Sequence, residues 1–421
     1  MTTLRFLTAV ESHGPGLTVI IEGLPAGLRL SAEDIQGELA RRRGGYGRGG
    51  RMKLETDALE VMGGLRGGVT LGTPVSLIIR NAEWESWEQA MHPWEAPNGP
   101  RSAPVTRPRP GHADLAGAAK YDHRDVRNVL ERASARETAA RVAAGVIAKK
   151  FLRELGIGVG AHVLGIGRAT TNGALPHASA SELGQFFEEV ESSPVRTGNQ
   201  VAEKWMMAEI DAAAACGDTL GGVFAVVAWG LPAGLGSHVQ WDRKLDARLA
   251  GAMMSIPGVK GVELGDGFAV AGMRGSQAHD EILPGGAEGG TAGGPTAGPF
   301  GTVRATNHCG GLEGGITTGQ PLLVRAAMKP IATLSKPLLS VDLATGKPEN
   351  AAVERHDTCA VPAAAVVGES MVALELARAV LETYGGDTVA DIRQRLGAAR
   401  ERMAAPWTGS AAEAAATKAD R

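Results

Sequence analysis

Aromatic residues, cysteines and long apolar runs are all scarce in this sequence of 421 residues. Only 4% of the residues are aromatic whereas 59 are glycine, so small side chains must provide much of the close packing. The cysteines, Cys216, Cys309 and Cys359, are widely spaced and form no CxxC pair. This pattern favours a reduced, cytoplasmic protein without disulfides or structural zinc, and we expect no bound metal.

Hydrophobic segments and net charge exclude further classes. No apolar run approaches the roughly 18 residues needed to span a bilayer, and the N-terminus lacks a signal-peptide core of useful length. The formal net charge of −3 and the isoelectric point near 6.4 argue against a general binder of nucleic acid or anionic membranes. Any site for an anion must therefore be a local concentration of positive charge.

The stretch 106–138 has such a concentration, with seven arginines or lysines in 33 residues. Pro108 and Pro110 stiffen the approach to His112, which we expect on an irregular loop. Apolar residues then recur at helical spacing as far as Phe151, with Asp125 as a candidate N-cap of one long helix. The layout suits either an anionic substrate or a buried basic helix with structural ion pairs, and these residues alone do not separate the two.

Local patterns predict the first elements of the chain. Alternating apolar residues predict strands at 4–10, 17–22, 52–62 and 75–79. Ser31, followed by acidic residues, predicts a helix that ends near Arg42. The segment 176–210 indicates surface helix, 284–301 a mobile glycine-rich loop, and 404–421 a disordered tail.

An internal repeat is the best architectural signal. GLPAGL occurs at 23–28 and 230–235, and GGVTLGTP at 67–74 matches GGITTGQP at 314–321. A fainter match pairs Glu131-Arg132 with Glu354-Arg355. Chance similarity between glycine-rich segments is the alternative explanation, but three matches in the same order favour duplication. We predict one domain over 1–403, built of two intertwined repeats at roughly 1–160 and 215–390.

Several clusters are candidates for chemistry. His13 lies in a Gly- and Pro-rich loop, where an imidazole is suited to protonate a leaving group. The basic loop Arg41–Arg51 is read as an anion clamp, a solvated loop or, third, an RNA contact. Gly314 and the segment from Lys329 to Thr333 offer amides, a lysine and a threonine for a phosphate. Asp357 beside His356 reads by itself as a helix cap, and Trp84, Trp87 and Trp94 read as packing residues.

Longer motifs carry a more specific signal. They are FLTAVESHGPGLTVIIEGLPAGL, RRRGGYGRGGRMKLETD, GGVTLGTPVSLIIRN, RPRPGHADLAGAAKY, ERASARETAARVAAG, GLGSHVQWDRKLDARLA, GGLEGGITTGQPLLVRAAMKPIATL and ERHDTC. In this order, and over residues 4 to about 390, the chain closely resembles the chorismate synthase family.

The resemblance implies a fold and a reaction. The fold is α+β, a β-α-β sandwich with internal duplication in which two antiparallel sheets enclose a helical layer, assembled as a homotetramer. The reaction is the anti-1,4-elimination of phosphate from 5-enolpyruvylshikimate-3-phosphate to give chorismate, the last step of the shikimate pathway. It needs reduced FMN without net redox change. Whether NADPH reduces the flavin on the protein itself or an external flavin reductase supplies it stays open.

The resemblance also assigns residues to roles. His13 would protonate the departing phosphate, His112 would lie near flavin N1 and Asp357 near flavin N5, supported by Ser12 and Ser134. Arg42 and Arg48 would lie at the substrate or NADP end of the basic loop. The FMN contacts carried over are Arg132, Ala133, Ser134, Pro257, Gly258, Gly314, Lys329, Pro330, Ile331, Ala332, Thr333 and Arg355.

Four positions depart from the family pattern. Val10 and Asp122 replace common glycines, Ala133 a frequent serine and Thr358 a frequent proline. Val10 matters most, since a β-branched residue adopts a left-handed turn only at a cost. The competing hypotheses are a non-catalytic anion- or RNA-binding protein that uses the Arg41–Arg51 loop, and an oligomer that has kept the fold but lost turnover.

Overall fold

Two antiparallel sheets dominate the structure. The computed structural model describes residues 4–171, 179–285 and 298–405. The first sheet has the order β1 (Arg5–Val10), β2 (Gly16–Glu22), β6 (Val75–Arg80), β3 (Leu59–Gly63). The second has the order β8 (Ala169–Thr170), β7 (Gly158–Ile166), β9 (Gly222–Trp229), β15 (Leu322–Met328), β10 (Val259–Leu264). Antiparallel sheets mixed with helices confirm the predicted α+β class.

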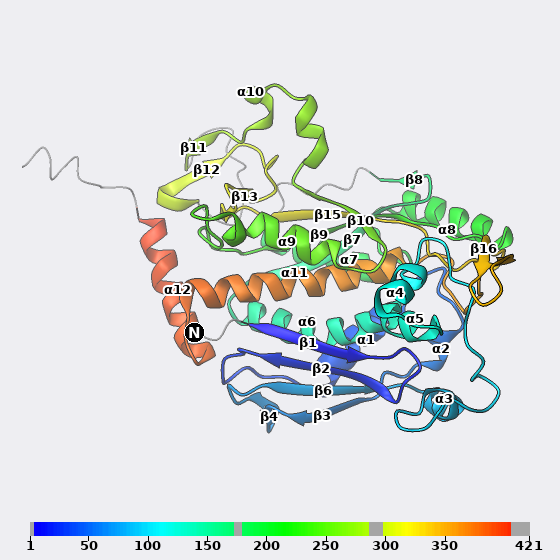
Figure 1. Cartoon of the computed structure of the whole chain (residues 1–421). Helices are drawn as coiled ribbons and strands as arrows, with labels where there is room; N and C mark the ends of the chain where they lie inside the picture. The colour runs from blue at the N-terminus through cyan, green and yellow to red at the C-terminus, as the bar shows by residue number, and fades with distance from the viewer. Residues whose placement is uncertain (1–3, 172–178, 286–297, 406–421) are drawn as a thin grey trace, which may run out of the picture.

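Helices lie between the two sheets, as Figure 1 shows. α6 (Thr138–Glu154) packs on β2 of the first sheet, and α11 (Val361–Tyr384) packs on β7 and β9 of the second. The two helices also pack on each other, with α1 (Ala32–Arg43) and α9 (Leu245–Met254) beside α11. Most of α11 is buried on all sides, which fits a helix enclosed by other elements.

Small residues permit this close packing. At the crossing of α6 and α11, a Cβ on Gly145 would lie 2.2 Å from the Cβ of Ser370, so a larger residue would force the helices apart. Both helices also carry fully buried alanines, including Ala139, Ala140 and Ala365. Close approach of the helices thus goes together with the small number of large aromatic side chains in the chain.

The two GLPAGL segments make the same hydrogen bonds. In the first, the Thr70 hydroxyl donates to the Pro25 carbonyl at 2.7 Å and accepts from the Leu28 amide at 2.9 Å. In the second, the Thr317 hydroxyl donates to the Pro232 carbonyl at 2.7 Å and accepts from the Leu235 amide at 2.8 Å. The strand order agrees as well. If four strands of each sheet are numbered along the chain, both sheets have the order first, second, fourth, third: β1, β2, β6, β3 in one and β7, β9, β15, β10 in the other.

The register of strand pairing is also the same in the two sheets. The first residue of β6, Val75, pairs with Ile21, which lies two residues before the first GLPAGL. The first residue of β15, Leu322, pairs with Ala228, which lies two residues before the second. The repeated motifs therefore fix strand pairing in the same way in both sheets.

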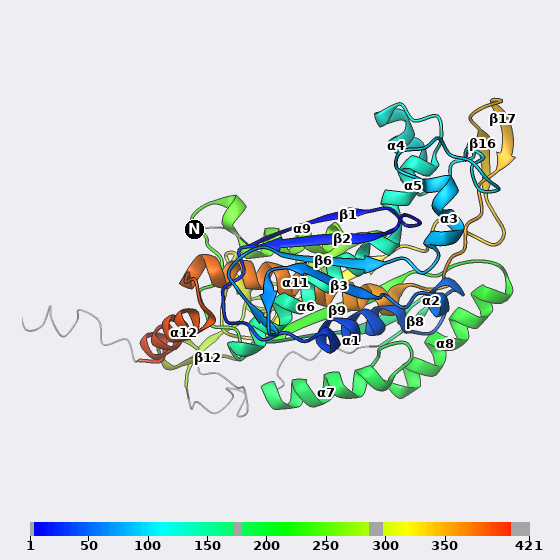
Figure 2. The same ribbon diagram turned by 90° about the horizontal axis from the view of Figure 1, so that it is seen from below.

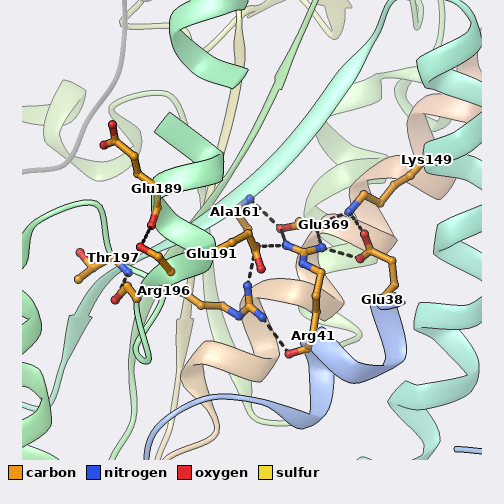
Figure 3. A network of polar contacts seen from close by, with 11 residues as sticks. Glu38, Arg41, Lys149, Ala161, Glu189, Glu191, Arg196, Thr197 and Glu369 are labelled. Carbon is orange, nitrogen blue, oxygen red and sulfur yellow. Dashed lines mark hydrogen bonds and ion pairs between the residues drawn. The ribbon is translucent and has the colours of Figure 1, made fainter. Parts of the chain in front are cut away.

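A buried ion network ties the helical layer together (Figure 3). Glu369 of α11 accepts hydrogen bonds from both terminal nitrogens of Arg41 at 2.8 Å and from Lys149 at 2.6 Å. Its fourth donor is the Ala161 amide of β7, at 3.0 Å. Glu38 accepts from the same two cations, so α1, α6, α11 and β7 meet at one carboxylate.

Two local predictions need correction. The segment 52–62, predicted as one strand, contains the end of α2 (Arg51–Leu54), a loop and the start of β3. In that loop Asp57 adopts a positive φ of 51°, and its carboxylate binds Arg136. The long helix predicted from Asp125 is broken into α5 (Arg127–Ala133), a short 3-10 turn and α6. Ser134 is extended there; its hydroxyl donates to the Ser12 hydroxyl at 3.1 Å and accepts from the Arg136 amide at 3.3 Å, so it caps the 3-10 turn.

Other predicted elements are confirmed. β1, β2 and β6 lie where expected, and Ser31 caps α1 with a reciprocal bond to Asp34. Asp125 accepts the amide of Arg127 at 2.9 Å just before α5, but the N-cap residue of α5 is Val126, which makes no side-chain cap. The predicted surface helix at 176–210 is α7 (Ala180–Ser192) and α8 (Gln200–Ala215). Most of the predicted mobile loop and nearly all of the tail lie outside the described residues.

The remaining elements are short, apart from the C-terminal helix. They are α3 (Trp84–Met91), α4 (Asp114–Tyr121), α10 (Gly275–Ala278), α12 (Val389–Ala404), and the strand pairs β4 (Leu65–Arg66) with β5 (Val69–Thr70), β11 (Ile282–Pro284) with β12 (Thr302–Arg304), β13 (Leu312–Glu313) with β14 (Ile316–Thr317), and β16 (Leu339–Asp342) with β17 (Lys347–Asn350). Figure 2 shows α3, α4, α5 and the β16–β17 hairpin gathered at one end of the molecule. In the described ranges, no helix combines the length and apolarity that crossing a membrane would require.

Candidate active site

A cavity of about 780 Å³ collects nearly all of the candidate residues. Its lining comes from the β1–β2 loop, the end of α1, the loop before α4, the α5–α6 break, the turn after α9 and the segments that follow β15 and precede α11. The candidates that line it are Ser12, His13, Arg42, Arg48, His112, Arg132, Ala133, Ser134, Pro257, Gly258, Lys329, Pro330, Ile331, Ala332, Thr333, Arg355 and Asp357.

Gly314 is the one candidate outside this cavity. It lies in the turn between β13 and β14 with a φ of 60°, and the nearest side chain to a Cβ placed there is His238, at 3.9 Å. Its role in this chain is the tight turn of the second GGxT motif, which only a glycine adopts at low cost. The FMN contact expected for Gly314 therefore stays a prediction.

His13 is held by a carboxylate and an indole. Its Nδ1 lies 2.8 Å from Oε1 of Glu131, and its backbone amide donates to Oε2 at 2.7 Å. The Trp87 ring stacks on the imidazole with centroids 4.0 Å apart. Burial by itself raises the pKa of the Glu131 carboxyl, but the hydrogen bonds from His13 and the charge of Arg127 outweigh it and lower that pKa. Glu131 is therefore an anion, so the hydrogen of His13 lies on Nδ1 and points at this carboxylate.

His112 has the same kind of support. Its Nδ1 lies 2.5 Å from Oδ1 of Asp114, a buried residue whose other oxygen accepts from Arg109 Nε at 2.8 Å. Hydrogen bonds from His112 and Arg109 lower the pKa of Asp114 despite the opposing effect of burial. Arg109 also donates to the Thr333 hydroxyl at 3.0 Å, which links the His112 loop to the segment after β15. Asp114 thus fixes both the ring plane and the tautomer of His112.

Asp357 anchors the basic loop. Its two oxygens accept from Arg48 Nη1 at 2.5 Å and from the Gly49 amide at 2.6 Å. A Cβ on Gly49 would lie 2.4 Å from the His356 carbonyl oxygen, so this approach requires glycine. The carboxylate, which alone suggested a helix cap, instead pairs with a cation inside the cavity.

Arg42 is buried without a carboxylate partner. Its Nε donates to the Thr138 hydroxyl and one terminal nitrogen to the Ala135 carbonyl, both at 2.8 Å. The other terminal nitrogen, Nη1, has no hydrogen-bond partner among the described residues. Burial and the neighbouring charges of Arg136 and Arg48 lower the pKa of Arg42 to about 9. An anion bound here would relieve this uncompensated charge.

The cavity as a whole is positively charged. Nine arginines or lysines line it, against three carboxylates. Arg136 is neutralised by Glu55 and Asp57, and Arg132 and Arg355 pair with Glu137 and Glu83. Within residues 4–171, 179–285 and 298–405, no acidic side chain lies at ion-pair distance from Arg42, Lys260 or Lys329. This excess suits a ligand that carries several negative charges.

The four departures from the family pattern fit the backbone. Val10 ends β1 with ordinary strand geometry, so the expected cost of a left-handed turn does not arise. Asp122 does take the left-handed conformation, with a φ of 53° after α4, which aspartate tolerates better than most residues. The Thr358 amide donates to the Gly47 carbonyl at 2.9 Å, a bond that proline could not make. Ala133 lies at the cavity wall beside Ser134.

Sequence reasoning missed the residues that support the histidines. Glu131 and Asp114 lie in the stretch singled out first, and Asp114 follows His112 by two residues, but their pairing depends on the fold. Trp87 was read as a packing residue, and it is buried, yet it packs on His13. Trp94 is 90% exposed and belongs to no cluster with it.

A second group of polar residues lies away from the cavity. Asp280, Cys309 and Glu313 are close enough together to suggest a metal site. The Asp280 carboxylate already accepts from the amides of His308 and Cys309 and from the Thr306 hydroxyl. Burial and the Asp280 carboxylate raise the pKa of Cys309 to about 12, which disfavours the thiolate that a metal would need.

Comparisons with known proteins agree with this geometry. The sequence model of the chorismate synthase family matches residues 4–381. The chorismate synthase of Salinispora tropica is 54% identical over 399 residues, covering 93% of this chain and 97% of the relative. That of Mycobacterium avium is 52% identical over 407 residues, covering 95% and 97%. A solved structure, "Crystal Structure of Chorismate Synthase", aligns with a TM-score of 0.74 at 41% identity and covers 96% of this chain and 99% of that one. With its family match running almost from end to end, this chain belongs to the chorismate synthase family.

Proposed function

We propose that this protein eliminates phosphate from 5-enolpyruvylshikimate-3-phosphate to form chorismate, as the family does. The observation that carries the proposal is the cationic cavity with two histidines, each held by a buried carboxylate. The substrate carries two carboxylates and a phosphate, so arginines and lysines in a partly closed site would bind it through charge-assisted hydrogen bonds. Membership of the family at more than half identity supports the same reaction.

FMN fits the residues that line the cavity. A volume of about 780 Å³ lies in the range of cofactor sites. The orphaned donor of Arg42 and the unpaired Lys260 and Lys329 supply cations for anionic ligands, while Ile256, Pro257 and Ala332 provide apolar wall. Arg132, Ser134 and Arg355 would add polar contacts, as the family resemblance implies. Reduced FMN, when bound, supplies transient electron density to the substrate ring, and the protein supplies orientation and charge.

His13 is proposed as the general acid for the departing phosphate. Because Nδ1 bonds Glu131, the proton would pass through Nε2. Glu131 holds Nδ1, and the Trp87 face keeps the ring plane fixed. Ser12 and Ser134, whose hydroxyls lie 3.1 Å apart, would orient neighbouring groups.

His112 and Asp357 are proposed to work at the flavin. The pairing of His112 with Asp114 leaves its Nε2 to hold a proton near flavin N1. Asp357, paired with Arg48, would lie near flavin N5 and assist removal of the second hydrogen from the substrate ring. Arg42 and Arg48 would bind the substrate or a nicotinamide cofactor at the other end of the basic loop.

The finer architecture and assembly belong to the same proposal. Equal strand order, equal register and the matching Thr70 and Thr317 bonds support a duplicated β-α-β sandwich. A homotetramer is supported by an apolar outer face on the first sheet, where Leu7 and Ile20 are cross-strand neighbours, 72% and 41% exposed. We further propose a cytoplasmic location, with flavin reduced either by NADPH on the protein or by an external reductase.

An RNA-binding role for the basic loop is the weaker alternative. The Arg41 side chain is committed to Glu38, Glu191 and Glu369, and that of Arg42 is buried. Arg43 pairs with Asp57 and Arg48 with Asp357, so these four side chains point into the protein and not toward a polyanion outside. Salt-sensitive RNA retention without any effect of flavin would favour that alternative.

An anaerobic assay tests the proposed reaction. Purified protein is mixed with photoreduced FMN and 5-enolpyruvylshikimate-3-phosphate, and chorismate absorbance and free phosphate are followed together. We expect equimolar release of both, and none with oxidised FMN. A parallel reaction with oxidised FMN and NADPH reports intrinsic flavin reduction. Flavin binding without either product would contradict the catalytic role while leaving the fold intact.

A further inference from the structure

The loop that carries His13 is held through its backbone by two other segments. This loop, residues 11–15, joins β1 to β2 and would be mobile if its amides and carbonyls bonded only to water. On one side, the Glu131 carboxylate of α5 accepts from the His13 amide at 2.7 Å. The Glu131 carbonyl accepts from the Ser12 amide at 3.1 Å. One residue of α5 thus holds two amides of the loop.

Asn81 holds the carbonyls of the same loop. It follows β6 directly and is 5% exposed. Its Nδ2 donates to the Gly14 carbonyl at 2.7 Å and to the Glu11 carbonyl at 3.3 Å. Its backbone amide donates to the Pro15 carbonyl at 3.4 Å. Three carbonyls of the loop are therefore bound by one residue.

A buried arginine fixes the direction in which the Asn81 amide points. Arg136 Nε donates to the Asn81 Oδ1 at 3.0 Å. The terminal nitrogens of Arg136 donate to Asp57 and Glu55, so each nitrogen of this guanidinium is bonded to a protein oxygen. Because a guanidinium only donates and a backbone carbonyl only accepts, Oδ1 must face Arg136 and Nδ2 must face the loop. Asn81 therefore couples the His13 loop to a cation in the cavity wall.

The segment that begins with Asn81 also reaches the His13 ring. The Asn81 carbonyl accepts from the Trp84 amide at 3.2 Å, where α3 begins. Trp87 lies in the same helix and stacks on the imidazole. The backbone of the loop and the plane of the His13 ring are thus both set by residues 81–87.

We propose that Asn81 is a positioning residue, which fixes the His13 loop so that the imidazole keeps one place in the cavity. The proposal rests on the function proposed above, in which His13 is the acid. Proton transfer needs the donor within hydrogen-bond reach of the departing group, and a displacement of about 1 Å can lower a rate about a hundredfold. Asn81 does not line the cavity that the described residues form, so its effect passes through the loop.

Two substitutions of Asn81 separate the role of the loop from that of the arginine. Asn81→Asp keeps an oxygen for Arg136 but removes the donor that binds the loop carbonyls. Asn81→Ala removes both interactions and adds no charge. Asn98→Asp makes the same change at an exposed loop position and is the matched control.

Hydrogen–deuterium exchange of the unliganded protein measures the order of the loop. Exchange is followed on peptides that cover residues 10–16, with peptides from α11 as the reference for global unfolding. We expect exchange at 10–16 to be about tenfold faster in both Asn81 variants, the factor for one or two lost hydrogen bonds, and unchanged in α11 and in the control. Unchanged exchange at 10–16, or equal acceleration there and in α11 in both variants, overturns the proposal.

Steady-state kinetics with photoreduced FMN and 5-enolpyruvylshikimate-3-phosphate measures the consequence for the reaction. We expect kcat to fall about tenfold to a hundredfold in both Asn81 variants while the substrate KM changes less than about threefold, because the acid is displaced and the ligand-binding side chains are not. Wild-type turnover in Asn81→Asp, or a KM that rises as much as kcat falls, overturns the proposal. A wild-type protein that forms no chorismate would refute the proposed function, and exchange at 10–16 would still decide whether Asn81 holds the loop.

Discussion

Replacing Glu369 by glutamine should destabilise the protein in a pH-dependent way. Glu369 is 1% exposed and accepts from Arg41, Lys149 and the Ala161 amide (Figure 3). Burial alone would raise the pKa of this carboxyl, but the charges of Lys149 and Arg41 outweigh it and lower the pKa from 4.5 to about 2. This difference corresponds to about 3 kcal/mol of folding stability at neutral pH. A neutral side chain would leave the two cations with Glu38 as their one shared carboxylate among the described residues, a loss of similar size.

The sign of the pH dependence follows from the lowered pKa. A carboxyl whose pKa is lower in the folded than in the unfolded state stabilises the fold fully above its unfolded pKa of 4.5. This stabilisation is lost as the pH falls toward 2, and about 1.4 kcal/mol of it should be gone by about pH 3.5. The gap between wild type and Glu369→Gln should therefore be widest at pH 7 and should narrow on acidification.

Urea unfolding, followed by circular dichroism at several pH values, measures this gap. Glu349→Gln, at an exposed position of β17, is the matched control and should change stability by less than about 0.5 kcal/mol. A gap for Glu369→Gln below about 1 kcal/mol at pH 7, or one that widens as the pH falls, would refute the assignment of Glu369 as a buried anion.

Three further predictions concern the site. His13→Ala should lower turnover by about 10²–10⁴-fold while the FMN dissociation constant changes little, and equal losses in both would mean that His13 is not the acid. Trp87→Leu should lower kcat more than it raises the substrate KM, because it frees the His13 ring plane, whereas Trp87→Phe should recover most of the rate; steady-state kinetics of the pair decides this. Asp357→Asn should weaken the hold on Arg48 and the Gly49 amide and slow single-turnover product formation at saturating substrate, and an unchanged rate would remove Asp357 from the mechanism.

Local sequence patterns predicted the elements whose causes are local. Ser31 caps α1 through a residue three positions away, and β2 alternates buried and exposed residues along its own length. The break at Ser134 could not be read this way, because the helical spacing of apolar residues continues across it. At this break Ser134 bonds Ser12, 122 residues earlier in the chain, a contact that local spacing does not encode.

The site was predicted through long motifs, and the partners of its residues were not. Motif matches placed His13, His112 and Asp357, and the fold brings all three to one cavity. The carboxylate of Glu131 reaches His13 from 118 residues away, and no periodicity encodes such a distance. Gly314 lies in a tight turn with a positive φ, and the FMN contact expected for it stays a prediction.

The unequal connections of the two sheets have a consequence for solubility. β1 and β2 are joined by residues 11–15, a turn short enough to hold His13 rigidly, whereas the corresponding strands β7 and β9 are separated by residues 167–221. That longer connection contains α7 and α8, which pack against β7 and β8 and run along one side of the molecule in Figure 2. The margin of an open sheet presents unpaired backbone groups that recruit strands from other chains. In the proposed duplicated fold, the copy without the proposed acid is free to lengthen its turn, and here the added helix α8 contacts β8, the edge strand of its sheet, where such recruitment would begin.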